Sequence, residues 1–357
     1  HRITYTKKNA EEMKKLQQYI DEDTKLRSSK TVNTYIGNMR LISKKLNIPI
    51  LKEGVFDFDK LSNTRLLFEN DWFKALKIDT QKNYMNGLIA CLEIVDKDKY
   101  DKSLVLLREK RDTHKNDIVK QYKTSTPSQK QQDNWISMKD LHEVAIPYYE
   151  DKIKSLFGKK TKHINMDNQR NLNAYLVCLL YCGKYLPMRR LEYNSTTILN
   201  NKEYDKLSSK TDNYLVMGRT KGFFSINRYK TDHKYGGIKL ELPNELFMIM
   251  KNILKASANN ELLFPCLENV NECMKQDKLG LFITQVLKEA TNKHLSVNIL
   301  RNIYTTEMYK ETHSLAEREE LAKLMGTSVK TQMLCYNKCC KDDIKDDVES
   351  EVSDCSV

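Results

Sequence analysis

The chain has 357 residues, with 60 Lys and Arg against 48 Asp and Glu, which gives a formal net charge of +12. This length predicts about two domains plus tails. The sequence has no run of eighteen apolar residues and no signal-peptide segment near its N-terminus, and its nine cysteines show no paired Cys-x-x-Cys spacing. These features argue against a membrane protein, a disulfide framework and a zinc site. We therefore expect a soluble, intracellular protein that uses no metal and no other cofactor.

The charge is unevenly distributed along the chain. The last segment, 341–357, holds two lysines against seven acidic residues, so the rest of the chain carries a net charge near +17. Such an excess suits a polyanionic partner, of which DNA and RNA are the commonest. The alternative is a lysine-rich solvated surface without such a partner. The acidic segment itself is typical of a disordered solubilising tail.

An N-terminal extension (1–26) precedes a predicted helical domain, which we place at 27–110. Apolar residues recur at helical spacing from Val32 to Leu46 and again from Tyr84 to Val95. The stretch 68–76 between them suggests a further helix. The polar faces of these helices carry basic residues, which include Lys30, Arg40, Lys44 and Lys82.

The composition turns polar at 111–133, which predicts a linker. A second domain follows at 134–340, where a new apolar pattern begins. Its first clear element is a buried helix around 172–180, in which Cys178 and Cys182 lie one turn apart, as is typical of core packing.

The second domain then alternates between strand and helix patterns. Strands are expected at 214–217, 223–229 and 237–242, and helices at 281–287, 297–309 and 321–325. The second and third strands flank a polar turn with two glycines, as a hairpin does. Gly326 ends the last helix as a C-cap glycine. The predicted fold class is mainly α (α+β), with a small antiparallel sheet in the second domain.

Four separated features of the second domain contain residue types that bind phosphate or act as nucleophiles. They are, in chain order, Arg189 with Glu192 three residues later, Lys230 where a strand meets the hairpin turn, Arg301 three residues after Asn298 on a helix, and Thr327 with Tyr336 nine residues beyond it. Each alone has an ordinary explanation, such as a surface ion pair or a packed tyrosine. Their joint occurrence in this order is what carries the resemblance described next.

This ordered set resembles the catalytic domain of tyrosine recombinases, whose pattern is Arg-x-x-Glu, a hairpin Lys, His-x-x-Arg, and Leu-Gly-His followed nine residues later by the nucleophilic Tyr. The first domain also resembles the core-binding domain of that family, which opens near Ser-x-x-Thr-x-x-x-Tyr, here Ser28, Thr31 and Tyr35. The resemblance covers about 27–338. Its motifs are most similar to those of eukaryotic and large-DNA-virus recombinases of the Crypton type, which are enzymes of mobile elements and viruses.

The resemblance implies a site-specific DNA recombinase or integrase that cuts and rejoins duplex DNA through a 3′-phosphotyrosine intermediate at Tyr336. Arg189 and Arg301 would stabilise the pentacoordinate phosphorane, because each guanidinium offers a planar fork of donors. Lys230 would donate a proton to the leaving 5′ oxygen, although Lys234 competes for this role.

The remaining implications concern Glu192 and the partners. Glu192 would orient Arg189 from one helical turn away. The resemblance further implies double-stranded DNA as the partner, a homo-tetramer built as a dimer of dimers on DNA, no membrane, and a location in the nucleus or a viral replication compartment. No cofactor is implied, since the phosphotyrosine keeps the bond energy. DNA contacts are expected from Lys30, Arg40, Lys44, Lys82, Arg190 and Lys234.

Two positions depart from the family pattern. Asn298 stands where the family has His, and Thr327 stands where it has His or Trp. Both can donate a hydrogen bond to a phosphate, yet neither acts as an acid or base near pH 7. Two alternatives therefore stay open: a type IB topoisomerase-like enzyme that relaxes DNA, and a catalytically weakened integrase relic that only binds DNA.

Overall fold

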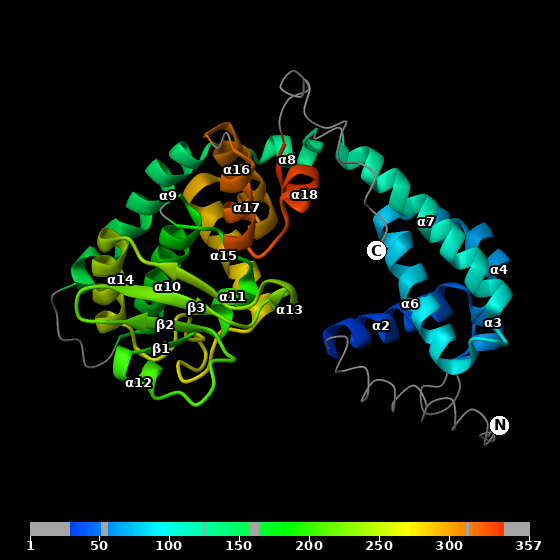
Figure 1. Cartoon of the computed structure of the whole chain (residues 1–357), viewed down its shortest axis with the longest axis horizontal. Coiled ribbons are helices and arrows are strands. Elements are labelled where there is room, and N and C mark those ends of the chain that lie inside the picture. The colour runs from blue at the N-terminus through cyan, green and yellow to red at the C-terminus, as the bar shows by residue number, and fades with distance from the viewer. Residues whose placement is uncertain are drawn as a thin grey trace. The chain divides into compact units, whose positions relative to one another are not determined.

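The structure, a computed structural model, describes residues 29–50, 56–123, 126–157, 164–183, 185–311 and 314–338. The chain divides after Lys123 into two compact units, unit 1 and unit 2 (Figure 1). The predicted extension at 1–26 and the acidic tail at 341–357 lie outside the described residues. The predicted fold class is confirmed, because the chain is mainly helical with one small sheet in unit 2.

The described part of unit 1 is helical. Its helices are α2 (Ser29–Lys45), α3 (Phe58–Leu61), α4 (Thr64–Glu69), α5 (Asp71–Lys74), α6 (Ile78–Asp96) and α7 (Asp101–Lys123). The helices expected around Val32–Leu46 and Tyr84–Val95 are confirmed as α2 and α6. Their apolar stripes, with Met39 and Ile42 on α2 and Leu88 and Leu92 on α6, lie in one core.

The linker prediction for 111–133 is wrong over its first half. Residues 111–123 continue α7, and Gln129–Asp133 form the short helix α8. One face of α7 is buried along Leu104, Leu107 and Ile118, although most residues at 111–123 are exposed or half-buried. His114 lies on the same face, where its Nε2 pairs with Gln81 Oε1 at 2.8 Å. A single buried stripe suffices to hold a helix against a neighbour whatever its mean hydropathy.

Unit 2 combines helices with a four-stranded sheet. The helices that follow α8 are α9 (Met138–Ile153), η2 (Lys154–Leu156), α10 (Met166–Tyr181), α11 (Arg190–Asn194), α12 (Asn201–Asp205), α13 (Asp232–Tyr235), α14 (Asn244–Ala256), α15 (Gln276–Thr291), α16 (Val297–Glu311), α17 (Leu315–Leu324), α18 (Val329–Thr331) and η3 (Gln332–Tyr336). The strands are β1 (Thr197–Leu199), β2 (Tyr214–Met217), β3 (Gly222–Ile226) and β4 (Ile238–Glu241), in that order across the sheet.

The three predicted strands are present, and β3 and β4 pair as the expected antiparallel hairpin. Two details differ from the prediction. The sheet is mixed instead of antiparallel, because β1, which the sequence did not indicate, pairs with β2 in parallel. The turn between β3 and β4 also contains the short helix α13. A three-residue strand such as β1 is too short to leave a period-two pattern.

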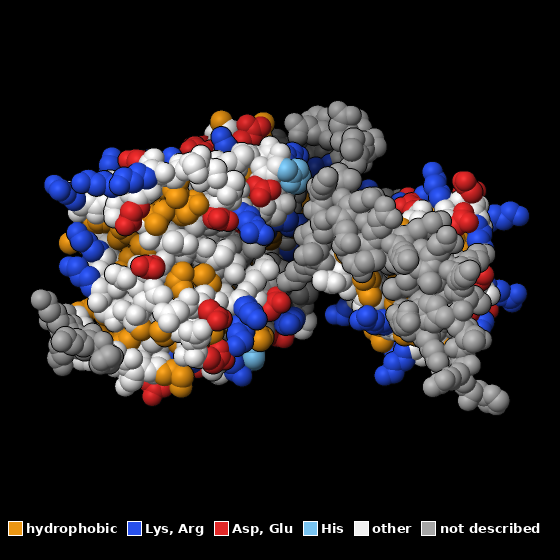
Figure 2. All heavy atoms as spheres, turned by 90° about the horizontal axis from the view of Figure 1, so that it is seen from below, with side chains coloured by type: hydrophobic (Ala, Val, Ile, Leu, Met, Phe, Trp, Pro, Cys, Tyr) orange, Lys and Arg blue, Asp and Glu red, His pale blue; other side chains and the backbone are white. Residues whose placement is uncertain are grey.

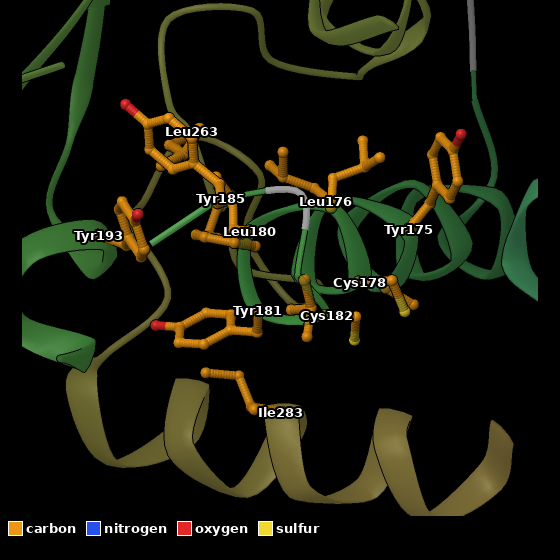
Figure 3. Packing of buried hydrophobic residues seen from close by; sticks show 14 of the residues in the cluster. Tyr175, Leu176, Cys178, Leu180, Tyr181, Cys182, Tyr185, Tyr193, Leu263 and Ile283 are labelled. Carbon is orange, nitrogen blue, oxygen red and sulfur yellow. The ribbon is translucent and has the colours of Figure 1, made fainter. Parts of the chain in front are cut away.

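The core of unit 2 is built around α10 (Figure 3). Cys178 and Cys182 are fully buried there, as predicted. The ring of Tyr193 on α11 lies 5.8 Å from that of Tyr181 and 5.3 Å from that of Phe224 on β3, as measured between ring centroids. These aromatic contacts fix α11, and with it the preceding residue Arg189, against the sheet and α10.

Candidate active site

Arg301 is the fully buried centre of the candidate site. It lies in the second turn of α16 with 0% of its surface exposed. Its guanidinium donates to Pro187 O at 2.8 Å through Nη1 and to Met325 O at 3.0 Å through Nη2. The Nε–H has no hydrogen-bond partner among the described residues. A charged side chain in this position therefore ties two distant backbone segments together and still has a donor to spare.

Arg189 approaches the same place from another element. It is the residue before α11, in extended conformation, and its Nη1 donates to Gly326 O at 3.0 Å. Glu192 lies one turn further on and is fully buried, with Oε1 3.8 Å from Arg189 Nη1. This distance makes an ion pair that is too long for a hydrogen bond. Burial raises the pKa of Glu192, although the charges of Arg189 and Arg301 oppose this rise.

Tyr336 completes the group. It is the last residue of η3, a five-residue π-helical segment in which Asn337 N donates to Gln332 O at 2.7 Å. The guanidinium carbon of Arg301 lies 4.8 Å from the centre of the Tyr336 ring. Burial alone raises the pKa of Tyr336, but the positive charges of Arg301 and Arg189 outweigh it and hold this pKa below its ordinary value of 10.0.

Helix α16 also anchors the segment that carries Tyr336. Thr306 Oγ1 accepts from Lys338 N at 2.9 Å and donates to Tyr336 O at 3.5 Å. Tyr309 OH donates to Gln332 Oε1 at 2.7 Å. One helix thus supplies the buried guanidinium and the groups that hold the tyrosine backbone beside it. Single-turn π-helical segments are frequent at functional sites, where they reposition a side chain.

Lys230 lies in the turn after β3, and its side chain is exposed. The two residues beside it both contact Gly326. Thr231 Oγ1 donates to Gly326 O at 2.8 Å, and a Cβ placed on Gly326 would lie 3.0 Å from the Tyr229 ring. Burial, followed by the charge of Asp232, raises the pKa of Tyr229 to about 12. The turn is therefore connected to the backbone carbonyl that Arg189 also uses.

The two residues that depart from the family pattern are placed differently from each other. Thr327 is 4% exposed and directly follows Gly326. Asn298 is exposed on the first turn of α16 and lines a shallow hollow with Gly280 and Thr284 of α15. The structure thus gathers Arg189, Arg301, Glu192 and Tyr336, whereas Asn298 faces this other hollow.

The predicted DNA-contacting residues lie in both units. Arg40 and Lys44 are exposed on α2, Lys82 is half-buried on α6, and Lys234 is exposed on α13. The side chains of Lys30 and Arg190 lie outside the described part of the structure. Figure 2 shows lysine and arginine side chains over the visible face of each unit, with acidic side chains among them.

The described residues contain neither a metal-binding cluster nor a membrane-spanning helix. They contain no group of three or more His, Cys, Asp or Glu that could hold a metal ion. None of the helices within the described ranges is long and apolar enough to cross a membrane.

Several residues of the site were not identified from the sequence. The sequence identifies Gly326 only as a helix stop, yet its carbonyl accepts from both Arg189 and Thr231. Thr306 and Gln332, which anchor the Tyr336 segment, carried no sequence signal. For Thr231, the sequence signal is its position directly after Lys230.

Comparison with known proteins finds a distant likeness among solved structures. No protein-family model matches the chain, and no curated protein matches it. Among solved structures, the chain is similar to XerA recombinase, with a TM-score of 0.38 and 12% sequence identity over 93% of this chain and 95% of that chain. A likeness this distant carries no conclusion about function, which has to come from the site itself.

Proposed function

We propose that this protein is a tyrosine-type DNA strand transferase that cuts and rejoins duplex DNA, acting as a site-specific recombinase or integrase. The observation that supports this most is the convergence of Tyr336 with two guanidiniums, those of Arg301 and Arg189, which hold the pKa of the phenol below its ordinary value. A lowered pKa makes the phenolate easier to form, and the phenolate is the nucleophile that attacks a phosphodiester. The two cations beside it can stabilise the charge that develops on the phosphate.

In the proposed step, Tyr336 Oη attacks the phosphorus atom and the bond to the 5′ oxygen breaks. The phenolic proton passes to solvent, and the leaving oxygen takes a proton from Lys230. The products are a 3′-phosphotyrosine and a 5′-hydroxyl end. Rejoining is the reverse reaction, so the cycle uses no external energy source.

The two arginines would stabilise the negative charge of the phosphorane. Arg189 uses one nitrogen on Gly326 O, and the Nε–H of Arg301 has no hydrogen-bond partner within the described ranges. Because Arg301 is already held by two carbonyls, its charge needs no rearrangement when the phosphate binds, and preorganised charge of this kind is a large source of catalysis. Glu192 balances the charge of Arg189 from its buried position.

A second candidate function is DNA binding without cleavage. The exposed position of Asn298, together with a threonine at 327, favours it, because neither residue replaces an imidazole in proton transfer. General acid–base catalysis contributes about 10²–10⁴ in rate. We propose Thr327 as a neutral hydrogen-bond donor, with Asn298 outside the group that meets the phosphate, which predicts a slow enzyme that carries out the same reaction.

The decisive experiment traps the covalent adduct. Selection of randomised duplexes with the Tyr336→Phe protein identifies the bound sequence, and nicked versions of that duplex then serve as suicide substrates. The proposal expects an adduct with the unmodified chain and none with Tyr336→Phe at equal binding. Binding without an adduct in both proteins would support the DNA-binding alternative. Fast relaxation of plasmids of any sequence by the monomer would instead indicate a topoisomerase.

The proposal includes duplex DNA as substrate, contacted through Arg40, Lys44, Lys82 and Lys234, with Lys30 and Arg190 as further contacts. It also includes a homo-tetramer on DNA, in which paired protomers exchange strands, and action in the nucleus or a viral replication compartment. Sedimentation of the complex with the selected duplex tests the assembly. A complex that stays at one protomer per site would contradict strand exchange.

A further inference from the structure

The turn that carries Lys230 is closed by its own hydrogen bonds. Tyr229 OH donates to Gly236 O at 2.7 Å, and Gly236 N donates to Asp232 O at 2.8 Å. Tyr229 N also donates to Asp232 Oδ2 at 3.3 Å. Gly236 has a φ of +68°, which glycine adopts without strain. Because these bonds fix the turn internally, an anchor at one of its residues places all of it.

That anchor is Thr231. Its Oγ1 donates to Gly326 O at 2.8 Å, and the same carbonyl accepts from Arg189 Nη1 at 3.0 Å. Gly326 itself has a φ of +60° and lies so close to the Tyr229 ring that a Cβ would be 3.0 Å from it. One backbone carbonyl therefore fixes both a guanidinium of the site and the residue next to Lys230.

We infer that Thr231 is a positioning residue, which sets the reach of Lys230 to the leaving oxygen of the cut strand; this rests on the proposed function. The Lys230 side chain is exposed, so the protein controls its ammonium group mainly through the position of the turn. The Thr231 hydroxyl fixes that position relative to Arg189. Loss of the hydroxyl frees the turn while the two guanidiniums stay bonded to their carbonyls.

The chemistry of the leaving group separates this role from a general structural one. In the cut, the Lys230 ammonium gives its proton to the 5′ oxygen as the bond from phosphorus to that oxygen breaks and the bond from phosphorus to Tyr336 Oη forms. A sulfur atom in place of the 5′ oxygen leaves as a thiolate without a proton, because thiols are far more acidic than alcohols. Such a substrate needs the arginines and the tyrosine but not the lysine.

The experiment measures single-turnover adduct rates of the full chain on two versions of the selected duplex, one with oxygen and one with sulfur at the 5′ bridging position. We expect Thr231→Val to slow cutting of the oxygen substrate by about 10–100-fold, within the range for general acid catalysis. On the sulfur substrate the loss should be less than about threefold, as expected when no proton is needed. Thr231→Ser should restore the oxygen rate, since it keeps the hydroxyl.

Three variants serve as controls. Lys230→Ala should show the same pattern more strongly, whereas Arg189→Met should be slow on both substrates. Thr211→Val, at an exposed threonine of the same unit, should match the unmodified chain. Normal cutting of the sulfur substrate by Thr231→Val also shows that the variant is folded.

Two results would overturn the inference. One is an unchanged rate of Thr231→Val on the oxygen substrate, and the other is an equal loss on both substrates, which would mean that Thr231 acts through the arginines or the fold. If the unmodified chain formed an adduct with neither the oxygen nor the sulfur substrate, the proposed function would be overturned, and the inference with it.

Discussion

Replacement of Arg301 by lysine tests whether the buried guanidinium holds the site together. Arg301 bridges Pro187 O and Met325 O, at 2.8 and 3.0 Å, from a fully buried position. A lysine ammonium keeps the charge but lacks the planar fork that reaches both carbonyls. A hydrogen bond to a charged group is worth about 1.5–3 kcal/mol. The loss of one such bond, with one buried carbonyl left unpaired, should lower the free energy of unfolding by about 2–3 kcal/mol.

The two tryptophans of the chain provide a probe for each unit. Trp72 lies in unit 1 and Trp135 in unit 2, where it packs against the core. In a Trp72→Phe background, fluorescence during urea unfolding reports unit 2, which contains Arg301. The matched control is Arg219→Lys, an exposed arginine of the same unit, which should change the free energy of unfolding by less than about 0.5 kcal/mol.

The reasoning would be refuted if Arg301→Lys and Arg219→Lys unfolded at the same urea concentration with the same slope. The two carbonyl contacts would then contribute nothing to stability. A loss confined to the adduct rate, with unfolding unchanged, would give Arg301 a role in catalysis alone.

Three further outcomes are expected. Because Arg301 and Arg189 hold the pKa of Tyr336 below 10.0, adduct rates on the sulfur substrate, which needs no proton from Lys230, should reach their alkaline plateau below pH 10. Arg189→Met should shift this limb to higher pH in single-turnover pH profiles, and an unshifted limb contradicts the coupling. Gly326→Ala should destabilise unit 2 by about 1–3 kcal/mol, because the residue has a φ of +60°. By contrast, Gly37→Ala should stabilise unit 1 by about 0.5–1 kcal/mol, because Gly37 lies in α2 and the added methyl group would meet no neighbouring side chain. Urea unfolding that gave the two glycine variants the same change in free energy of unfolding would contradict both expectations. Lys44→Gln should reduce the slope of log affinity against log salt concentration by about one in DNA-binding titrations, and an unchanged slope removes Lys44 from the contacts.

The failure of the linker prediction shows what composition leaves out. Residues 111–123 are polar on average, yet they continue α7 because one stripe with His114 and Ile118 is buried. Whether such a stripe meets a partner depends on where the neighbouring helices lie. The same holds for β1, whose three residues form a strand because β2 lies on one side of them and the segment with Leu262 on the other.

The sequence by itself determined the features that depend on local spacing. Helical periodicity located α2, α6, α10 and α16, alternation and turn residues located the hairpin, and a glycine marked the end of α17. The order of Arg189, Lys230, Arg301 and Tyr336 pointed to one site before any geometry was known. Local spacing suffices for the helices and the hairpin because each of these signals involves residues within a few positions of one another. The four site residues are far apart in the chain, and only the resemblance to a family pattern groups them.

Only the tertiary structure decided how the site is held together. Its contacts join residues far apart in the chain: Arg301 bonds a carbonyl 114 positions away, Arg189 one 137 positions away, and Thr231 one 95 positions away. The acceptors are backbone carbonyls, which every residue has. The residue types at Pro187, Met325 and Gly326 therefore do not indicate that these carbonyls accept the hydrogen bonds. Packing of α11, α16 and the hairpin selects which carbonyls meet the guanidiniums, and that choice has no counterpart in local sequence.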